Sequence, residues 1–243
     1  MLAELLDLVL PATCALCHRP GGPLCPSCRD AAGECLHPSP RQAMPSPPPP
    51  GMPSCWVSAE ASGALRAVVT AYKDEGRRDL DRTLAGWLAP ALRAAVGADV
   101  AAREALRGRG LLVVPVPGSP RARRRRGDVP LMPLVTRSVE GLAGRATVAD
   151  VLRPTRVTRD QSTLDAAARA ANLAGAMVVR ERQEGVVRGN VCVVVDDLVT
   201  TGATLAEAAR ALREAGASRV LAAAIGATRR QIEARATLPG PLP

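Results

Sequence analysis

The sequence predicts an α/β protein in which helices flank a parallel sheet, with a small cysteine-bearing appendage at its N-terminus. Between about residues 54 and 228, strand-like and helix-like segments alternate, which is the pattern of βαβ units. Residues 191–195 are apolar and mostly β-branched, as is typical of a strand buried on both faces of a parallel sheet. Two Cys-x-x-Cys pairs precede this region, in a stretch too short to build a hydrophobic core of its own.

The chain is expected to divide into four parts. Residues 1–37 hold a leucine-rich helix and the cysteine pairs, and residues 38–53 form a Pro-rich linker with four consecutive prolines. Because Pro fixes φ and lacks an N–H group, we expect this linker to be extended and of polyproline type. Residues 54–236 form the α/β domain, and residues 237–243 form a loose tail.

Within the α/β domain, the periodicity of apolar residues predicts each element in turn. The expected strands are 55–60 (as an edge strand), 111–116, 176–179, 191–195 and 219–225, and the expected helices are 62–72, 78–96, 130–142, 164–173 and the segment after Thr204.

The start of the chain predicts neither a secretory signal nor a membrane anchor. The first ten residues are apolar but carry Glu4 and Asp7 and lack a leading positive region, which favours an amphipathic helix. No apolar run in the sequence is long enough to cross a bilayer, so no membrane insertion is expected. We therefore expect a cytoplasmic protein, in which clustered cysteines are metal ligands rather than disulfides.

The charge of the chain is strongly positive, with a net charge of +9 and a pI of about 10.1. Nearly all of this charge is arginine, and Lys73 is the only lysine. The excess has two interpretations, a compositional bias toward Ala and Arg or a preference for anionic ligands or nucleic acid. With no Phe, one Tyr and two Trp, the chain lacks the aromatic residues of a base-stacking platform for single strands.

The most informative segment joins the predicted strand 191–195 to the helix that follows it. Asp196 and Asp197 come directly after the strand, at the edge where open α/β sheets bind ligands. Such a pair accepts hydrogen bonds from ribose hydroxyls or holds a divalent cation. The next residues supply hydroxyl and backbone N–H groups at a helix N-terminus, which is an anion site; they are Thr200, Thr201, Gly202, Ala203 and Thr204.

The segment thus predicts a cradle for a sugar phosphate, with the ribose on the acids and the 5′-phosphate on the loop. The alternative is a buried strand that ends in a capped turn, in which Thr204 and Glu207 form only a capping box.

The cysteine pairs Cys14/Cys17 and Cys25/Cys28 predict a structural zinc site, because four thiolates at this spacing can surround Zn²⁺ tetrahedrally. The alternatives are a redox pair or a metal-free cluster. Three further residues lie close enough in sequence to replace one ligand: His18, Cys35 and His37.

A second ligand-binding candidate follows the predicted strand 111–116. The strand ends in Pro115-Val116-Pro117-Gly118, which must turn out of the sheet at the ligand edge and can offer backbone N–H groups to a pyrophosphate. An arginine run that ends at Arg126 follows, and its guanidinium groups can close over phosphates. The alternatives for this run are a solvated loop or a nucleic-acid patch.

The Asp-Asp-x3-Thr-Gly-Ala-Thr segment resembles the phosphoribosyl pyrophosphate (PRPP) motif of type I phosphoribosyltransferases. The chain as a whole resembles the ComF family of competence-associated proteins. Besides the Asp-Asp segment, the resemblance rests on the cysteine pairs, the Tyr72-Lys73 segment, the Val-Pro-Val-Pro turn, the arginine loop and the stretch Arg156…Gln161…Asn172. One departure lies at 126–130, where the family has Arg-Gly-Phe-Asn-Gln and this chain reads Arg-Gly-Asp-Val-Pro.

The resemblance implies a type I phosphoribosyltransferase-like sheet preceded by a four-cysteine zinc finger. It implies that Asp196 and Asp197 bind ribose hydroxyls and Mg²⁺, and that the Thr200–Thr204 loop binds the 5′-phosphate of PRPP or a nucleotide. It also implies that the turn formed by Val116, Pro117 and Gly118 approaches pyrophosphate. The implied activity is Mg²⁺-dependent transfer at C1 of PRPP, linked to competence and DNA uptake.

The alternative function is a non-catalytic DNA-uptake factor that binds single-stranded DNA or a helicase partner. A PRPP-sensing regulator is a weaker alternative, since the sequence shows no helix-turn-helix.

Overall fold

The computed structural model describes residues 13–108, 110–118, 131–142, 146–155 and 175–228. The predicted helix 164–173 and the predicted tail 237–243 lie outside the described residues, as do Arg126, Arg156, Gln161 and Asn172. So does the predicted N-terminal helix, which occupies the first ten residues.

The core of the protein is a six-stranded sheet in the order β1-β2-β8-β7-β3-β4. Its strands are β1 (Leu36–Ala43), β2 (Cys55–Glu60), β3 (Leu111–Pro115), β4 (Ala146–Val148), β7 (Val191–Val199) and β8 (Arg219–Ala227). Every neighbouring pair is parallel except β1 and β2, which run antiparallel. The predicted α/β class, with helices on a parallel sheet, is therefore confirmed; the antiparallel strand β1 at the edge was not predicted.

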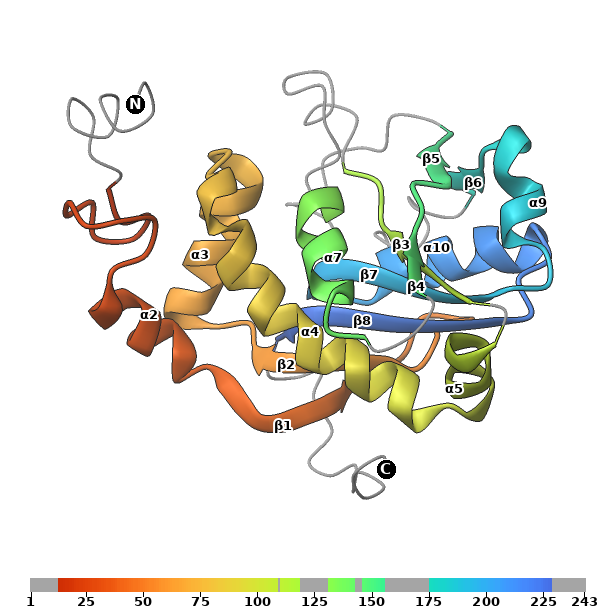
Figure 1. The fold of residues 1–243 in the computed structure, drawn as a ribbon, viewed down its shortest axis with the longest axis horizontal. Helices are drawn as coiled ribbons and strands as arrows, with labels where there is room; N and C mark the ends of the chain where they lie inside the picture. The colour runs from red at the N-terminus through yellow and green to blue at the C-terminus, as the bar shows by residue number, and fades with distance from the viewer. Residues whose placement is uncertain (1–12, 109, 119–130, 143–145, 156–174, 229–243) are drawn as a thin grey trace.

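Helices cover both faces of this sheet (Figure 1). One face carries α4 (Asp81–Ala98) and α7 (Leu131–Val139), which pack against each other, and α3 (Gly63–Asp74) lies beside them. The opposite face carries α10 (Ala203–Glu214), which packs on β7 and β8. The strand and helix positions predicted for these elements agree with the structure to within a few residues.

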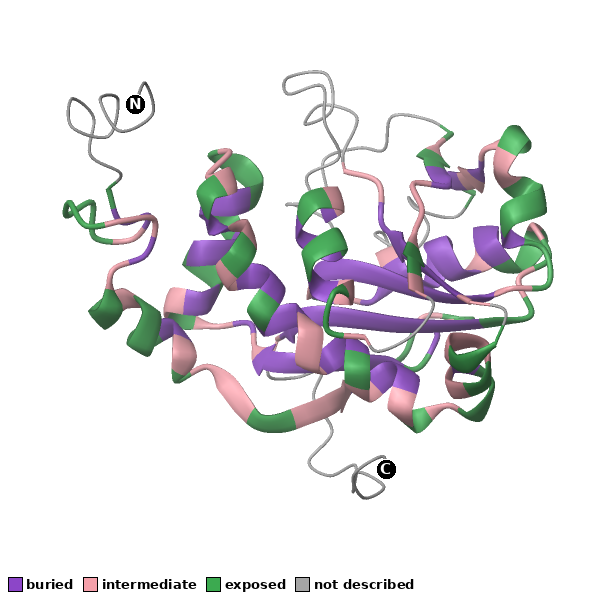
Figure 2. Cartoon of the chain, in the orientation of Figure 1, coloured by how far each residue is buried: buried purple, intermediate pink, exposed green. Residues whose placement is uncertain are grey.

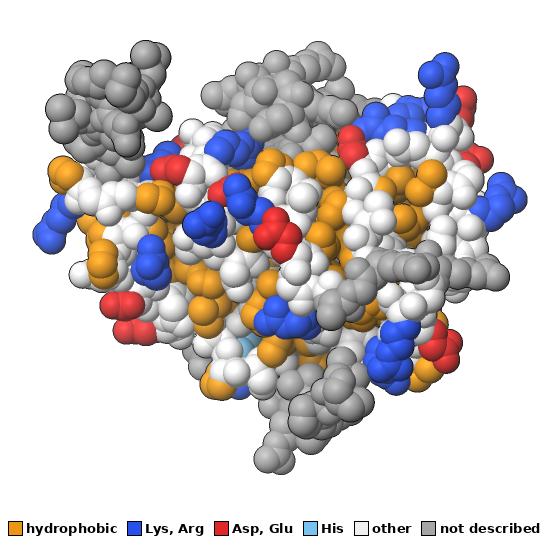
Figure 3. Space-filling model, in the orientation of Figure 1, with side chains coloured by type: hydrophobic (Ala, Val, Ile, Leu, Met, Phe, Trp, Pro, Cys, Tyr) orange, Lys and Arg blue, Asp and Glu red, His pale blue; other side chains and the backbone are white. Residues whose placement is uncertain are grey.

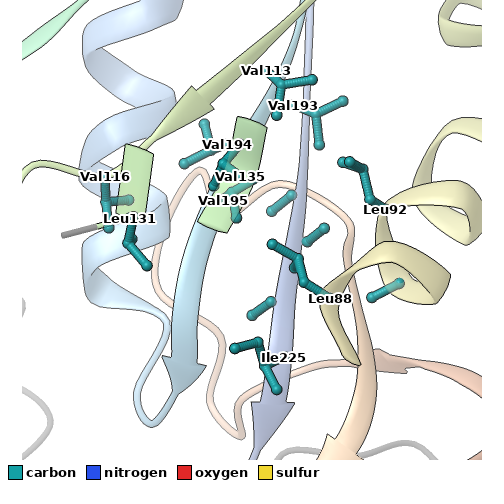
Figure 4. Close-up of a cluster of buried hydrophobic side chains, with 14 of the residues drawn as sticks. Leu88, Leu92, Val113, Val116, Leu131, Val135, Val193, Val194, Val195 and Ile225 are labelled. Atoms are coloured by element: carbon teal, nitrogen blue, oxygen red, sulfur yellow. The ribbon is translucent and has the colours of Figure 1, made fainter. Parts of the chain in front are cut away.

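The two central strands are buried along almost their whole length, as Figure 2 shows. Val193 and Ile225 on these strands are fully buried, and Leu88 and Leu92 of α4 pack over the same cluster (Figure 4). The continuous apolar run of β7 follows from this position, because a strand covered by helices on both faces has no polar side.

The Pro-rich stretch differs from the predicted extended linker. Its first part belongs to β1, which forms the edge of the sheet, so β2 is an inner strand rather than the edge strand that we predicted. The register of β1 shifts between Leu36 and Arg41, and Pro38 and Pro40 lie within this irregular part. Pro is tolerated there because an edge strand leaves its outer N–H groups unpaired. The proposed domain limits themselves stay a prediction.

The smaller elements lie outside the main sheet. The strands β5 (Leu152–Pro154) and β6 (Met177–Val179) form a separate antiparallel pair, so the predicted strand 176–179 exists but does not join the main sheet. The remaining elements are α2 (Pro26–Gly33), η1 (Arg78–Leu80), α5 (Val100–Arg107), η2 (Glu181–Gln183) and α9 (Glu184–Val187). In the described part of the chain, no helix has the length and apolarity that a membrane crossing requires.

Candidate functional site

The predicted acid pair lies at the carboxyl end of β7. The pairing of β7 with β3 ends at Val195, while its pairing with β8 continues to Val199. Asp196 and Asp197 therefore emerge just past the end of β3, and both are buried, with 8% and 6% of their surface exposed. A pair of buried carboxylates is costly unless each is hydrogen-bonded or ion-paired.

Each carboxylate of the pair is held by the backbone of the next residue. The N–H of Asp197 donates to Oδ1 of Asp196 over 2.8 Å, and the N–H of Leu198 donates to Oδ1 of Asp197 over 2.7 Å. The second oxygen of Asp197, Oδ2, lies 2.7 Å from Nζ of Lys73, at the end of α3. The carboxylates are therefore fixed in place, and one of them faces a cation.

Burial controls the charge of these groups. It raises the pKa of Asp196 to about 7, and the neighbouring charge of Asp197 contributes to the rise. Burial by itself lowers the pKa of Lys73, but the carboxylates of Asp197 and Asp196 outweigh it and raise that pKa above its ordinary value. Lys73 is thus cationic at neutral pH, and its charge partly offsets that of the acids.

The predicted phosphate loop follows directly. Gly202 has φ of 75° and is the N-cap of α10, so the chain turns there in the left-handed region that favours glycine. Thr201 Oγ1 accepts from the N–H of Ala203 over 3.4 Å, and both Thr200 and Thr204 keep contact with solvent. The loop thus presents hydroxyl groups and a helix N-terminus beside the acids, which suits an anion.

Gly202 also lies against the Pro-rich segment. A Cβ on Gly202 would come within 2.6 Å of Sδ of Met52 and 2.9 Å of Cγ of Pro45. Arg213, at the other end of α10, donates to the carbonyl of Gly51 over 2.6 Å. Residues 45–52 therefore support α10 and its loop, a contact that the sequence analysis did not predict.

The turn after β3 lies next to the acid pair. The N–H of Val116 donates to the carbonyl of Val195 over 2.9 Å, one residue before Asp196. This bond uses the amide of Val116, and Pro117 has none. Of the three residues predicted to approach a pyrophosphate, Gly118 is therefore the one with an N–H group left for it.

The capping-box alternative does not describe Glu207. Its Oε1 accepts from the N–H of Met177 in β6 over 2.9 Å and pairs with Arg210 over 2.7 Å, whose guanidinium also donates to the carbonyl of Met177 over 2.7 Å. Glu207 and Arg210 thus hold β6 through its backbone, as a neighbouring strand would. The N-cap of α10 is Gly202, without a side-chain capping bond.

The four predicted zinc ligands come together. The Sγ atoms of Cys14, Cys17, Cys25 and Cys28 all lie within 4.8 Å of one another. Those of Cys17 and Cys25 are 3.7 Å apart. Zinc–sulfur bonds of about 2.3 Å in a tetrahedron require sulfur–sulfur distances of about 3.8 Å. The cluster therefore fits Zn²⁺ in both ligand type and size.

Backbone N–H groups around the cluster favour the thiolate form of Cys14. Burial raises the pKa of Cys14, but N–H groups of Cys17, Cys25 and Leu16 outweigh it and bring that pKa to about 6. Hydrogen bonding with the Cys25 thiol, together with burial, raises the pKa of Cys28 to about 12. A cation at the centre would let all four sulfurs ionise together.

The three residues considered as replacement ligands lie elsewhere or serve the turn. Cys35 exchanges weak hydrogen bonds with Ser62, at 3.6 and 3.7 Å. His18 has φ of 58° and shapes the turn after Cys17, and His37 lies in β1. Among the described residues, the four cysteines are the one group of three or more His, Cys, Asp or Glu side chains that is placed to hold a metal.

The cysteine cluster is joined to the rest of the protein. Nη2 of Arg77 donates to the carbonyl of Thr13 over 2.6 Å, and the same guanidinium pairs with Asp79 over 2.7 Å. Cys14, Leu24 and Ala32 are buried in the same apolar core as the α/β domain. The appendage is thus packed against α3 rather than separate from it.

Comparison with known proteins agrees with this geometry. A family model for the phosphoribosyl transferase domain matches residues 141–237, which include β7, the acid pair, the loop and α10. A ribose-phosphate pyrophosphokinase from Pasteurella multocida (strain Pm70) is 36% identical over 89 residues, which are 37% of this chain and 26% of that protein. Residues 141–237 thus match the model of a phosphoribosyl transferase domain, and the chain spans about a quarter of the length of that relative.

Sequence reasoning missed the roles of two residues near the site. Glu207 was interpreted as a possible cap, although its partner is the backbone of β6. Lys73 entered only through a family resemblance, although its position as the single lysine among 32 basic residues was a usable signal.

Proposed function

We propose that this protein binds PRPP or a nucleotide and that, with PRPP and Mg²⁺, it transfers the phosphoribosyl group from C1 to a nucleophilic acceptor as pyrophosphate leaves. The observation that supports this proposal is the juxtaposition of a buried carboxylate pair with a glycine-containing loop at a helix N-terminus. The match to the phosphoribosyl transferase domain over the same residues adds to it.

In this proposal the acids and the loop have separate tasks. Asp196 and Asp197 accept hydrogen bonds from the ribose hydroxyls, and their oxygens are the kind of ligand that Mg²⁺ prefers. Hydroxyl and N–H groups of Thr200–Thr204 receive the 5′-phosphate. The N–H of Gly118 faces the pyrophosphate, and Arg126, outside the described residues, is expected to reach the phosphates.

Bond breaking at C1 places positive charge on the ribose and negative charge on the departing pyrophosphate. When bound, Mg²⁺ neutralises charge on the pyrophosphate. The carboxylates of Asp196 and Asp197, held by the N–H groups of Asp197 and Leu198, are already oriented beside the ribose. The protein therefore contributes position and fixed charge, where preorganised groups stabilise a transition state without reorganising.

The experiment is isothermal titration of the full chain with PRPP, with and without Mg²⁺. We expect micromolar, Mg²⁺-dependent binding that is lost when Asp196 and Asp197 are both replaced by Asn. The matched control is Asp81→Asn, which removes a carboxylate that pairs with Arg137 near the surface. Unchanged PRPP affinity in the Asp196/Asp197 double variant would refute the site assignment.

A second candidate is a DNA-uptake factor that binds single-stranded DNA or a helicase partner. It is supported by the net charge of +9 and by the resemblance to competence-associated proteins. On the face drawn in Figure 3, the described basic side chains are dispersed among acidic ones rather than aligned in a continuous track. Fluorescence anisotropy with a labelled oligonucleotide tests this candidate, since backbone contacts predict a steep loss of affinity with salt.

A further inference from the structure

The ion pair between Lys73 and Asp197 places a protein cation on Oδ2 of Asp197, the oxygen that the N–H of Leu198 does not use. Nζ of Lys73 lies 2.7 Å from Oδ2 of Asp197. The Lys73 side chain is half exposed, at 50%, whereas that of Asp197 is only 8% exposed. Lys73 therefore reaches from solvent onto a buried acid.

The choice of lysine at this position departs from the rest of the chain. The sequence has 32 basic residues, and Lys73 is the only one of them that is not arginine. A guanidinium binds a carboxylate with two parallel hydrogen bonds and holds it rigidly, whereas an ammonium is a single charge on a flexible stem. The single lysine of the chain therefore pairs with a carboxylate of the acid pair. There an ammonium can leave its partner more readily than a guanidinium would.

A divalent cation and the ammonium of Lys73 compete for Asp197. Both positive charges would lie within a few ångströms of each other on one carboxylate, where their repulsion is strong. An anionic ligand changes this balance, because its phosphates offer the ammonium another partner. Lys73 lies at the C-terminal end of α3, so its stem can move without disturbing the helix.

We propose that Lys73 is a displaceable internal counterion that keeps divalent cations off the acid pair until a sugar phosphate arrives. In the free protein the ammonium occupies Asp197. When a sugar diphosphate binds with its cation, Lys73 moves from the carboxylate onto a phosphate, and the cation takes its place. Cation binding is thereby coupled to ligand binding. The identity of the ligand rests on the proposed function, but the exclusion of the cation does not.

The test measures binding of Mn²⁺, a spectroscopic substitute for Mg²⁺, to the zinc-loaded full chain by electron paramagnetic resonance. The variants are Lys73→Met, Lys73→Arg and Arg66→Met, the last removing an exposed charge from the same helix. Without PRPP, we expect Lys73→Met to bind Mn²⁺ at least about tenfold more tightly than the unmodified protein. Arg66→Met and Lys73→Arg should match the unmodified protein.

Addition of PRPP provides the second half of the test. PRPP should raise the Mn²⁺ affinity of the unmodified protein and of Arg66→Met, and should raise that of Lys73→Arg much less, because the guanidinium stays on Asp197. Adding Asp197→Asn to Lys73→Met should abolish the gained Mn²⁺ binding. If it does not, the ion lies elsewhere and the inference fails.

The two proposals fail in different ways. Equal Mn²⁺ affinity of Lys73→Met and the unmodified protein in the absence of PRPP would overturn the counterion inference, whatever PRPP does. Absence of PRPP binding to the unmodified protein would overturn the proposed function, while a tighter Mn²⁺ site in Lys73→Met would still support the counterion. Circular dichroism melting of each variant confirms that the compared proteins are folded.

Discussion

At the residue scale, Gly202 carries two constraints that a single methyl group would violate. Its φ of 75° lies in the left-handed region, and a Cβ there would approach Met52 and Pro45 at 2.6 to 2.9 Å. We expect Gly202→Ala to lower the free energy of unfolding by about 1–2 kcal/mol from the backbone alone. Overpacking against Met52 should add about 1–3 kcal/mol. Urea unfolding measures the sum.

Gly189 is a matched control for this prediction. It has the same φ of 75°, but a Cβ there would meet nothing within 4 Å. Gly189→Ala should therefore show the backbone cost without the overpacking cost, and only Gly202→Ala should also weaken PRPP binding. Adding Met52→Ala should recover part of the stability lost in Gly202→Ala. Equal decreases in the free energy of unfolding of Gly202→Ala and Gly189→Ala would show that the Pro-rich segment does not constrain the loop.

Sequence reasoning at this scale succeeded where the chemistry is local. Asp196 and Asp197 could be located because they follow a buried strand directly, and their hydrogen bonds come from the next residue along the chain. The contacts of Lys73 with Asp197 and of Gly202 with Met52 could not be predicted, since each joins segments that lie far apart in the sequence. No local pattern specifies such a pairing.

At the element scale, α10 connects the predicted phosphate loop to the small sheet. Its first turn holds the loop, and Glu207 and Arg210 hold the backbone of Met177 in β6. Burial raises the pKa of Glu207, but the Arg210 guanidinium and the N–H groups of Met177 and Gly175 outweigh it and keep that pKa below its ordinary value. The carboxylate of Glu207 therefore stabilises the fold more than its neutral form does.

The sign of the pH dependence follows from this lowered pKa. The contribution of Glu207 is present above the unfolded value of about 4.3 and is lost as the pH falls through the lower folded value. We expect Glu207→Gln to cost about 1–2 kcal/mol of unfolding free energy at pH 7, and the difference from the unmodified protein to narrow below about pH 4. Urea unfolding at several pH values measures this difference.

Glu214→Gln is the control, because Glu214 also pairs with Arg210 but is 64% exposed. Its replacement should change stability little, as exposed ion pairs contribute little. If Glu214→Gln destabilises as much as Glu207→Gln, the bonds from Glu207 to β6 do not explain the effect.

The helices and strands were predictable where burial gives the sequence a continuous or periodic pattern of apolar residues. Strands β7 and β8 and helix α4 have continuous or amphipathic apolar patterns and were located from them. The edge strand β1 was not predicted, because Pro38 and Pro40 by themselves indicate a linker. These residues belong to the sheet only through the pairing of β1 with β2, which lies further along the chain. The strand at β6 was found from its apolar Met-Val-Val run, whereas its equally short partner β5 reads Leu-Arg-Pro and carries no such signal.

At the scale of the whole molecule, the cysteine cluster and the acid pair are connected through α3. Leu24 and Ala32 of the appendage share one apolar core with Leu65 and Val69 of that helix. The same helix ends at Asp74, directly after Lys73. If the cluster holds zinc, loss of the ion should therefore reach the candidate ligand site, although the cluster does not belong to that site.

Zinc removal is expected to loosen residues 13–33 first, since a bound zinc contributes about 10–16 kcal/mol to the folding of small zinc domains. The rate of amide hydrogen exchange should rise in residues 13–33 and, more weakly, in α3. The amides of β7 and β8 should remain protected from exchange. Cys28→Ser should reproduce this pattern and lose zinc, measured by mass spectrometry of the metal. Cys35→Ser should retain zinc, because Cys35 contacts Ser62 and lies outside the cluster.

The same comparison tests whether the appendage acts on the ligand site. If α3 transmits the loss of zinc to the ligand site, Cys28→Ser should weaken Mg²⁺-dependent PRPP binding. It should also allow Mn²⁺ to bind without PRPP, because a loosened α3 no longer holds Lys73 against Asp197. Cys35→Ser should show neither effect. Unchanged PRPP and Mn²⁺ binding in a zinc-free Cys28→Ser protein would mean that the α/β domain positions Lys73 by itself, through the packing of the buried face of α3.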